Sequence, residues 1–483
     1  MGSNPTIVLY PSPGMGHLVS MVELGKFTLN HHPGLAVTIL IVNPPYNTAA
    51  STAAYMNRVS ATTPSITFHH LPSPPLDPDS YPSLEALHFE LLRLSNPHVH
   101  QALQSISLTA GISAFIIDFF CTCALSVATN LGIPTYYFFT SGANCLALFL
   151  YLPTLHQSTN KSYKDLDELL HVPDLLPIPP RDMPVPLLER TSPEYAFFLD
   201  VGTQLAKSSG ILVNTFESLE PSILKSIADG KYVPGGPTPP VFSLGPLIAS
   251  DNGKGGGAAG GTGGGVHECL KWLDMQPSRS VVFLCFGSVG RFPAEQLKEI
   301  AIGLERSEQK LLWVVRSPPS EDKTNRFQTP PAPDLDLLLP HGFLDRTKGR
   351  GFVVSSWAPQ VDVLNHGSVG GFVTHCGWNS VLEAVRAGVP MVGWPLYAGQ
   401  KLNRLFLVEE MKLALPMDES TEGGFVEAAE IEKRVRGLMD SEEGKVIRET
   451  AQAKEEEAKQ AMADGGSSIV ALAKLVESWR KLE

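Results

Sequence analysis

A histidine follows a loop rich in proline and glycine near the start of the sequence. The stretch "IVLYPSPGMGHLVSM" leads from an apolar run through this loop to His17. Histidine titrates near neutral pH, so a histidine at such a position can act as a general base. The alternative is a histidine that caps a helix or lies on the surface.

An aspartate ends a second apolar run, in "SAFIIDFFCTCALSVA". Asp118 would be costly to bury at the end of a strand unless it were paired. A basic histidine needs a partner for its second ring nitrogen, and a His17–Asp118 dyad would supply it. Asp118 could instead cap the segment that follows it. The stretch "FGSVG" at 286–290 is not G-x-S-x-G, which disfavours an α/β-hydrolase.

A third cluster of polar residues lies in "GGFVTHCGWNSVLEAVRAG". Gly377 permits a tight turn from strand to helix, and Ser380 with Glu383 fits a capping box. The N-terminus of a helix that follows a strand also binds anions, because its N–H groups and dipole face the ligand. His375, Asn379 and Ser380 could therefore donate to a diphosphate.

The motif "SSWAPQ" adds a base and ribose site to the diphosphate site. Trp357 could stack on a nucleobase, and the backbone of Ala358 could bind the edge of the base. Gln360 and Glu383 could hold ribose hydroxyls, since Glu383 lies four residues after Asn379 on one helix face. No G-x-G-x-x-G stands at this turn, which disfavours a nicotinamide oxidoreductase.

Buried strands must position these residues. Apolar runs alternate with helix-length amphipathic stretches, and continuous apolar runs are typical of parallel strands covered on both faces. We expect two doubly wound α/β domains that face each other across a cleft, with ligands at the carboxyl ends of the strands. The expected strands are 6–10, 37–42, 114–118, 135–139, 210–214, 281–286, 311–316, 352–355, 371–374 and 390–394.

A segment of nearly pure Gly and Ala divides the chain. "DNGKGGGAAGGTGGG" lacks the order of a phosphate-binding loop, because its lysine comes early and no strand precedes it. It is typical of a flexible linker. We therefore expect an N-terminal domain at 1–248, a linker at 249–266 and a C-terminal domain at 267–465.

Composition excludes several classes of protein. The chain has 483 residues, 43% of them hydrophobic, and a net charge of −12, which argues against a nucleic-acid ligand. Its six cysteines show neither metal-ligand nor disulfide spacing, so we expect no metal. No signal peptide or apolar stretch of membrane-spanning length is present, which predicts a cytoplasmic protein.

The segment from Trp357 to Gln400, "WAPQVDVLNHGSVGGFVTHCGWNSVLEAVRAGVPMVGWPLYAGQ", resembles the signature box of plant secondary-product UDP-glycosyltransferases. These are inverting family 1 enzymes with the GT-B fold. The motifs "PSPGMGH", "IIDFFC" and "CFGS" also match the family, so the resemblance covers nearly the whole chain. Within the family, the sequence is most similar to the branch that acts on flavonoids and chalcones.

The resemblance implies roles for individual residues. His17 is the implied catalytic base and Asp118 its partner. The implied reaction transfers a sugar, with glucose as the expected one, from a UDP-sugar to a phenolic hydroxyl without metal or cofactor. It implies a monomer in which a C-terminal helix, 466–483, packs back on the N-terminal domain. The implied donor-binding residues are Thr140, Ser288, Trp357, Ala358, Gln360, His375, Gly377, Trp378, Asn379, Ser380, Glu383, Tyr397, Gly399 and Gln400.

One residue departs from the family pattern. The family usually has Asp or Glu before the closing glutamine, where this chain has Gly399. Trp378 and Gln400 favour glucose, but the departure leaves a different UDP-sugar open, and C-glycosylation remains an alternative to O-glycosylation. A UDP-sugar-binding protein without activity is a further alternative, although it would not need both His17 and Asp118.

The acceptor is expected to be flat and apolar. Aromatic residues gather in sequence near Asp118, and most are expected in the core, with one or two facing the acceptor. The proline-rich stretch 172–188 could line the same pocket. The aromatic candidates are Phe119, Phe120, Tyr136, Phe138, Phe139 and Phe149.

Overall fold

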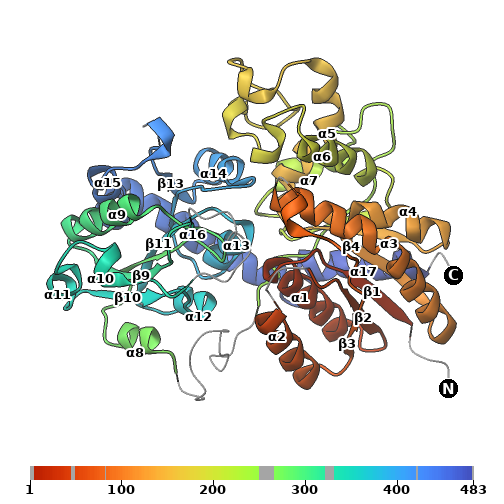
Figure 1. Cartoon of the computed structure of the whole chain (residues 1–483), viewed down its shortest axis with the longest axis horizontal. Coiled ribbons are helices and arrows are strands. Elements are labelled where there is room, and N and C mark those ends of the chain that lie inside the picture. The colour runs from red at the N-terminus through yellow and green to blue at the C-terminus, as the bar shows by residue number, and fades with distance from the viewer. Residues whose placement is uncertain are drawn as a thin grey trace. The chain divides into compact units, whose positions relative to one another are not determined.

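The computed structural model describes residues 5–44, 49–81, 83–249, 266–320, 331–419 and 422–480. The chain divides into two compact units (Figure 1). Unit 1 comprises residues 1–249 and 460–483, and unit 2 comprises residues 250–459. Of the expected linker, residues 250–265 lie outside the described residues.

Unit 1 is built on a parallel sheet in which the described strands follow the order β3-β2-β1-β4-β5-β6-β7. β1 and β5 are buried along their whole length, as their unbroken apolar sequences predict. The strands are β1 (Thr6–Tyr10), β2 (Ala36–Ile41), β3 (Ile66–His70), β4 (Ile112–Asp118), β5 (Thr135–Phe139), β6 (Gly210–Val213) and β7 (Val241–Ser243).

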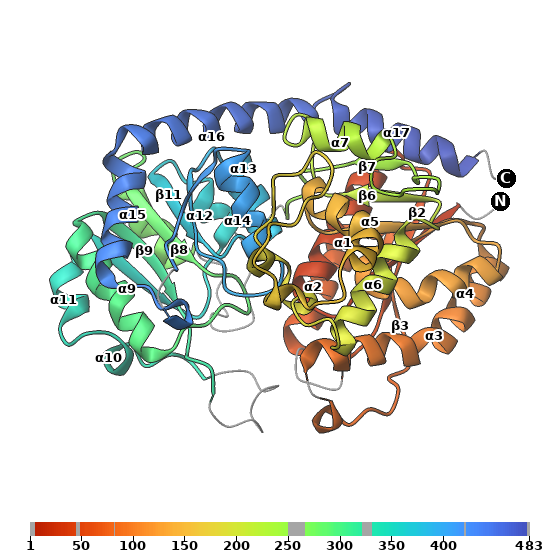
Figure 2. The same cartoon turned by 90° about the horizontal axis from the view of Figure 1, so that it is seen from above.

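The helices of unit 1 connect these strands, and the last helix of the chain joins them. In the helix α17 (Ser467–Arg480), Leu472, Leu475, Val476 and Trp479 are buried in the same core cluster as β1 and β4. Both views draw α17 beside this sheet (Figures 1 and 2). The other helices are α1 (Met15–His31), α2 (Ala49–Thr62), α3 (Leu84–Thr109), α4 (Leu125–Asn130), α5 (Ala143–Ser158), α6 (Pro193–Leu205) and α7 (Pro221–Ala228).

Unit 2 has a second parallel sheet, with its described strands in the order β10-β9-β8-β11-β12-β13. The strands are β8 (Val281–Cys285), β9 (Lys310–Val315), β10 (Gly351–Ser355), β11 (Val369–Thr374), β12 (Met391–Gly393) and β13 (Ala414–Pro416). A regular parallel sheet in each unit is what the continuous apolar runs predict.

Amphipathic helices cover the sheet of unit 2. In α9 (Ala294–Ser307), Leu297, Ile300, Ala301 and Leu304 form a buried stripe with helical spacing. α9 packs on α15 (Ala428–Asp440), and the two lie side by side in Figure 2. The others are α8 (Glu268–Asp274), α10 (Leu335–Leu338), α11 (Phe343–Thr347), α12 (Gln360–Leu364), α13 (Trp378–Arg386), α14 (Gln400–Glu409) and α16 (Glu442–Ala461), the last of which leads to α17.

Three strands escaped the sequence analysis, and all three are sheet edges: β3, β7 and β13. β3 is exposed over much of its length, and β7 and β13 have three residues each. Short or half-exposed edge strands lack the continuous apolar run used to find the others. The remaining strands lie within about two residues of their expected bounds, the usual uncertainty of an element's end.

Within the described ranges, every helix is too short or too polar to cross a bilayer.

The burial of α17 predicts that the last turn of this helix stabilises unit 1. Replacing Trp479, which is 3% exposed, by alanine should cost about 3–5 kcal/mol, because it leaves a cavity in the core. Hydrogen–deuterium exchange of β1 and β4 measures this loss as faster exchange. Val470→Ala on the same helix is the control, since Val470 is 41% exposed. Equal protection of β1 in both variants would contradict the prediction.

Candidate active site

The carboxyl ends of β1, β4 and β5 bring together the predicted residues of unit 1. These strands are neighbours, and Tyr10 at the end of β1 pairs in register with Ile117 of β4. The loop after β1 ends at Gly14, whose φ of 131° is a conformation that L side chains rarely adopt, and α1 begins at Met15. His17 therefore lies in the first turn of α1, beside the end of β4.

His17 and Asp118 form the predicted pair. Nδ1 of His17 lies 2.7 Å from Oδ2 of Asp118. The other carboxylate oxygen, Oδ1, accepts a hydrogen bond of 3.0 Å from the backbone N–H of Phe120. Asp118 therefore has both roles that the sequence left open, since it also caps the short helix η2 (Phe119–Ala124). Its side chain is fully buried, whereas that of His17 is 27% exposed.

The electrostatics of the pair favour a protonated imidazole. Burial alone would lower the pKa of His17, but the charge of Asp118 and its hydrogen bond outweigh burial and raise the pKa above 6.5. Because Nδ1 faces the carboxylate, Nε2 is the ring nitrogen left to exchange a proton with another molecule. The side chain is partly exposed, so such a molecule can reach it.

Aromatic rings surround the dyad. Phe120 packs its ring edge-to-face with His17, with 5.2 Å between the centroids. Of the six aromatic candidates, only Phe119 and Phe120 are partly exposed, and the other four are core residues, as expected for most of them. Sequence analysis missed Phe89, Phe197 and Phe198, which complete the cluster from α3 and α6. Only the fold brings these distant segments together.

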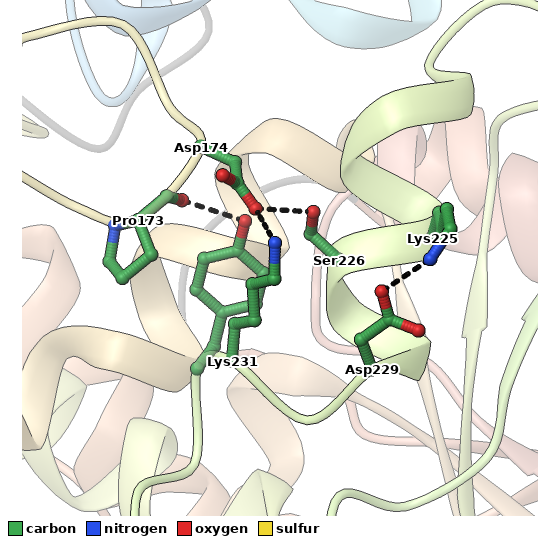
Figure 3. A network of polar contacts seen from close by, with 7 residues as sticks. Pro173, Asp174, Lys225, Ser226, Asp229 and Lys231 are labelled. Atoms are coloured by element: carbon green, nitrogen blue, oxygen red, sulfur yellow. Dashed lines mark hydrogen bonds and ion pairs between the residues drawn. The ribbon is translucent and has the colours of Figure 1, made fainter.

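The start of the proline-rich stretch is tied to the segment around α7 (Figure 3). Asp174 accepts hydrogen bonds of 2.6 Å from Nζ of Lys231 and from Oγ of Ser226. The hydroxyl of Tyr232 donates to the carbonyl of Pro173 at 2.8 Å. Lys231 and Asp174 are both exposed, so solvent screens their ion pair and it adds little to stability. The contacts fix where this stretch begins, whatever its role toward a ligand.

In unit 2, the turn from β11 to α13 differs from its expected form. The helix begins at Trp378 with Gly377 as its N-cap, and no side chain caps it, so the predicted capping box of Ser380 and Glu383 is wrong. The left-handed residue of the turn is Cys376, with φ of 63°, whereas Gly377 has ordinary angles. Gly377 is needed instead because it leaves space for the imidazole of His375.

The imidazole of His375 lies between two glycines. A Cβ atom added at Gly287 would lie 2.6 Å from Nε2 of His375, and one added at Gly377 would lie 2.4 Å from the same atom. Residues other than glycine would therefore push the imidazole out of this space. His375 is 6% exposed, and burial lowers its pKa to about 4, so it is neutral at physiological pH. Its Nδ1 is buried without a hydrogen-bond partner in the described structure.

The predicted ribose residues contact one another. Nε2 of Gln360 donates to Oγ of Ser380 at 2.8 Å and to Oε2 of Glu383 at 2.6 Å. The short helix α12 carries Gln360 from the end of β10 to α13. Trp357 precedes this helix and is 36% exposed. Its ring and that of His267 pack edge-to-face. Ala358, the next residue, is buried. Along the carboxyl ends of β10 and β11, the order is therefore Trp357, the Gln360–Glu383 pair and the start of α13.

The other predicted donor residues follow strands of their own units, and in unit 2 the ring of Tyr397 lies 6.0 Å from that of His375. Thr140 follows β5 and Ser288 follows β8, where its carbonyl accepts from Arg316. Trp378 is largely buried. The side-chain oxygen of Gln400 accepts from the backbone N–H groups of Leu396 and Tyr397, which shapes the loop that contains Gly399.

Among the residues that the structure describes, no group of three or more His, Cys, Asp and Glu side chains is placed to hold a metal ion.

Comparison with known proteins identifies the family. Residues 264–429 match the model of the family described as UDP-glucoronosyl and UDP-glucosyl transferase. The chain is 52% identical to UDP-glycosyltransferase 88B1 of Stevia rebaudiana, covering 98% of both chains. It belongs to the plant UDP-glycosyltransferases. A phloretin 2'-O-glucosyltransferase of Malus domestica is 50% identical, with 98% of this chain and 99% of the relative covered.

Solved structures of plant UDP-glycosyltransferases share the fold. Phytolacca americana UGT2, in complex with UDP-2fluoro-glucose and pterostilbene, superimposes with a TM-score of 0.86 at 38% sequence identity. The match covers 99% of this UDP-glycosyltransferase and 100% of that chain. The predicted GT-B class, with two doubly wound Rossmann-like domains, is confirmed.

The dyad makes a prediction about the pKa of His17. Asp118→Asn keeps an oxygen that can accept from the backbone N–H of Phe120 but removes the negative charge. Burial then becomes the dominant effect on the pKa of His17. We expect its pKa to fall from above 6.5 in the native protein to below 6.5 in the variant. An NMR titration of the imidazole, assigned with His17→Gln, measures both values. An unchanged pKa would contradict the role given to Asp118.

Proposed function

We propose that this enzyme transfers glucose from UDP-glucose to a hydroxyl of a phenolic or flavonoid-type small molecule, with His17 as general base. The observation that carries the proposal is the 2.7 Å contact between His17 and the buried Asp118. The partly exposed phenylalanines beside His17 suit a flat aromatic acceptor. The relatives support it by name, since one is a phloretin glucosyltransferase and another an anthocyanidin 5,3-O-glucosyltransferase of a Rosa hybrid cultivar.

Proton transfer must accompany bond formation. A phenol with a pKa near 10 and a histidine near 6.5 differ by about 3.5 units, so full transfer beforehand would cost roughly 5 kcal/mol. Asp118 raises the pKa of His17 and narrows this gap. As the phenol oxygen attacks the anomeric carbon, its proton moves to Nε2 of His17, and Asp118 stabilises the imidazolium that forms.

The leaving group is UDP, whose negative charge must be stabilised. The N-terminus of α13 presents its dipole at the end of β11, and His375 presents a neutral imidazole there with an unpaired Nδ1. We assign the diphosphate to this turn, the ribose to Gln360 and Glu383, and the base to Trp357. Attack opposite the leaving group inverts the anomeric centre, so an α-linked donor gives a β-glycoside, and no metal is required. A cytoplasmic monomer remains a prediction.

The variant His17→Ala tests the proposal directly. Loss of a general base should lower kcat/KM for a phenol by about 10²–10⁴-fold while the Kd for UDP changes little. Transfer is measured by mass spectrometry of mixtures containing UDP-glucose, a panel of phenols and no added metal. Retained transfer with lost UDP affinity would reverse the assignment, and transfer that requires a metal would refute the metal-free mechanism.

A matched variant on the donor side should weaken the binding of UDP, which His17→Ala should leave nearly unchanged. Glu383→Ala removes the proposed acceptor of the ribose hydroxyls, so its Kd for UDP should rise by about 10-fold or more. Its affinity for 2',3'-dideoxy-UDP should equal that of the native protein, because this analogue lacks both hydroxyls.

The donor sugar is the second point to test. Gly399 stands where the family usually has an acidic acceptor for sugar hydroxyls, so a UDP-sugar other than UDP-glucose is the alternative donor. Gly399→Glu should raise kcat/KM for UDP-glucose, since a charge-assisted hydrogen bond contributes about 1.5–3 kcal/mol. Side-by-side rates with UDP-glucose, UDP-galactose and UDP-xylose measure the change. A lower or unchanged value for UDP-glucose would show that residue 399 does not face the sugar.

A further inference from the structure

Two arginines of unit 2 lie at the turn that follows β8, residues 286–290. Arg316 is the first residue after β9, the parallel neighbour of β8. Its Nη1 donates a hydrogen bond of 2.8 Å to the carbonyl of Ser288 in the turn. Arg291 directly follows the turn, and both arginines line one small cavity of about 10 Å³. The turn after β8 is therefore bounded by two positive charges that lie near each other.

These charges have no counter-charge in the described structure. Among the described residues, no carboxylate forms an ion pair with Arg316 or Arg291. Arg316 is half-buried, and its Nε is buried without a hydrogen-bond partner. Burial lowers the pKa of Arg316, and the nearby charge of Arg291 also lowers it. A half-buried guanidinium beside a second cation is costly, and an anionic ligand would supply the missing negative charge.

The turn after β8 contacts the proposed diphosphate site. Gly287 in this turn has a φ of 74°, and a Cβ atom there would lie 2.6 Å from Nε2 of His375. Burial raises the pKa of Tyr397 and the charge of Arg316 opposes this effect, while the Tyr397 ring lies 6.0 Å from that of His375. Because β8 and β11 are adjacent parallel strands, the turn and the N-terminus of α13 lie at the same edge of the sheet.

We propose that Arg316 and Arg291 supply the positive charge that stabilises the diphosphate of UDP, and that Arg316 also positions the turn after β8 beside it. His375 is neutral, and the N-terminus of α13 contributes only a partial charge, so the two arginines are the full charges at this site. Fixed charges act most strongly where negative charge develops, which here is the leaving group. The inference rests on the proposed function and assigns the electrostatics of its diphosphate site.

Affinities for three ligands separate the effect of charge from that of the fold. UDP, UMP and uridine share the base and the ribose but differ in phosphate charge, and calorimetric titration measures each Kd. Arg316→Met removes the charge, so the Kd should rise about 10-fold for UDP, less for UMP and not at all for uridine. Arg316→Lys restores the charge and should recover most of the affinity for UDP. Added salt should reduce the difference between the native protein and Arg316→Met, because it screens the charge.

A second variant tests the charge without disturbing the turn. Arg291→Met leaves the hydrogen bond between Arg316 and Ser288 in place, and it should raise the Kd for UDP by about 3-fold while the Kd for uridine stays constant. Lys310→Met is the control, since it removes the same charge from the other end of β9, about 20 Å away. It should leave all three Kd values unchanged.

The outcomes distinguish this inference from the proposed function. An equal rise in Kd for UDP and uridine in Arg316→Met would overturn the inference, because it would mean that Arg316 only supports the fold. An unchanged Kd for UDP in both arginine variants would overturn it as well. A native protein that binds UDP but transfers no sugar to any phenol would instead refute the proposed function and leave the role of the two arginines intact.

Discussion

The buried carboxylate of Asp118 is the constraint around which the site of unit 1 is built. A fully buried charge is costly unless every oxygen has a partner, and here one oxygen faces His17 while the other accepts from the backbone of Phe120. His17 reaches Asp118 because β1 and β4 are parallel neighbours whose carboxyl ends coincide, whereas Phe120 follows Asp118 by only two residues. The same carboxylate orients the imidazole, raises its pKa and starts the helix that carries Phe120. Fold and proposed chemistry therefore depend on one pair of contacts.

In unit 2, by contrast, His375 is uncharged. His375 has no carboxylate partner, and burial keeps its pKa low. Its position depends on Gly287 and Gly377, which come from the ends of adjacent strands, β8 and β11. In the motif "HCGW", the glycine is therefore required to leave space for the histidine, in addition to the donor groups that the motif supplies. One histidine is suited to accept a proton and the other to donate a hydrogen bond, and their neighbours alone account for the difference.

Features set by local sequence could be predicted, and features set by tertiary contact could not. The buried strands, the place of His17 in the first turn of a helix and its pairing with Asp118 follow from apolar runs and parallel topology. The cap at Ser380 was misplaced because Cys376 takes the left-handed turn and lets α13 begin at Trp378. Phe89 and Phe197 lie more than a hundred residues apart, and only the packing of α3 on α6 makes them neighbours.

The place of α17 in the core of unit 1 has a consequence for biosynthesis. During translation the first strands leave the ribosome long before Leu472, Leu475 and Trp479, which complete their packing. The intervening residues, 250–459, take roughly 10–40 s to synthesise at ordinary elongation rates. Throughout that interval the apolar side chains of unit 1 that pack against α17 lack these partners. The core of unit 1 is therefore completed only after the whole of unit 2 has been synthesised.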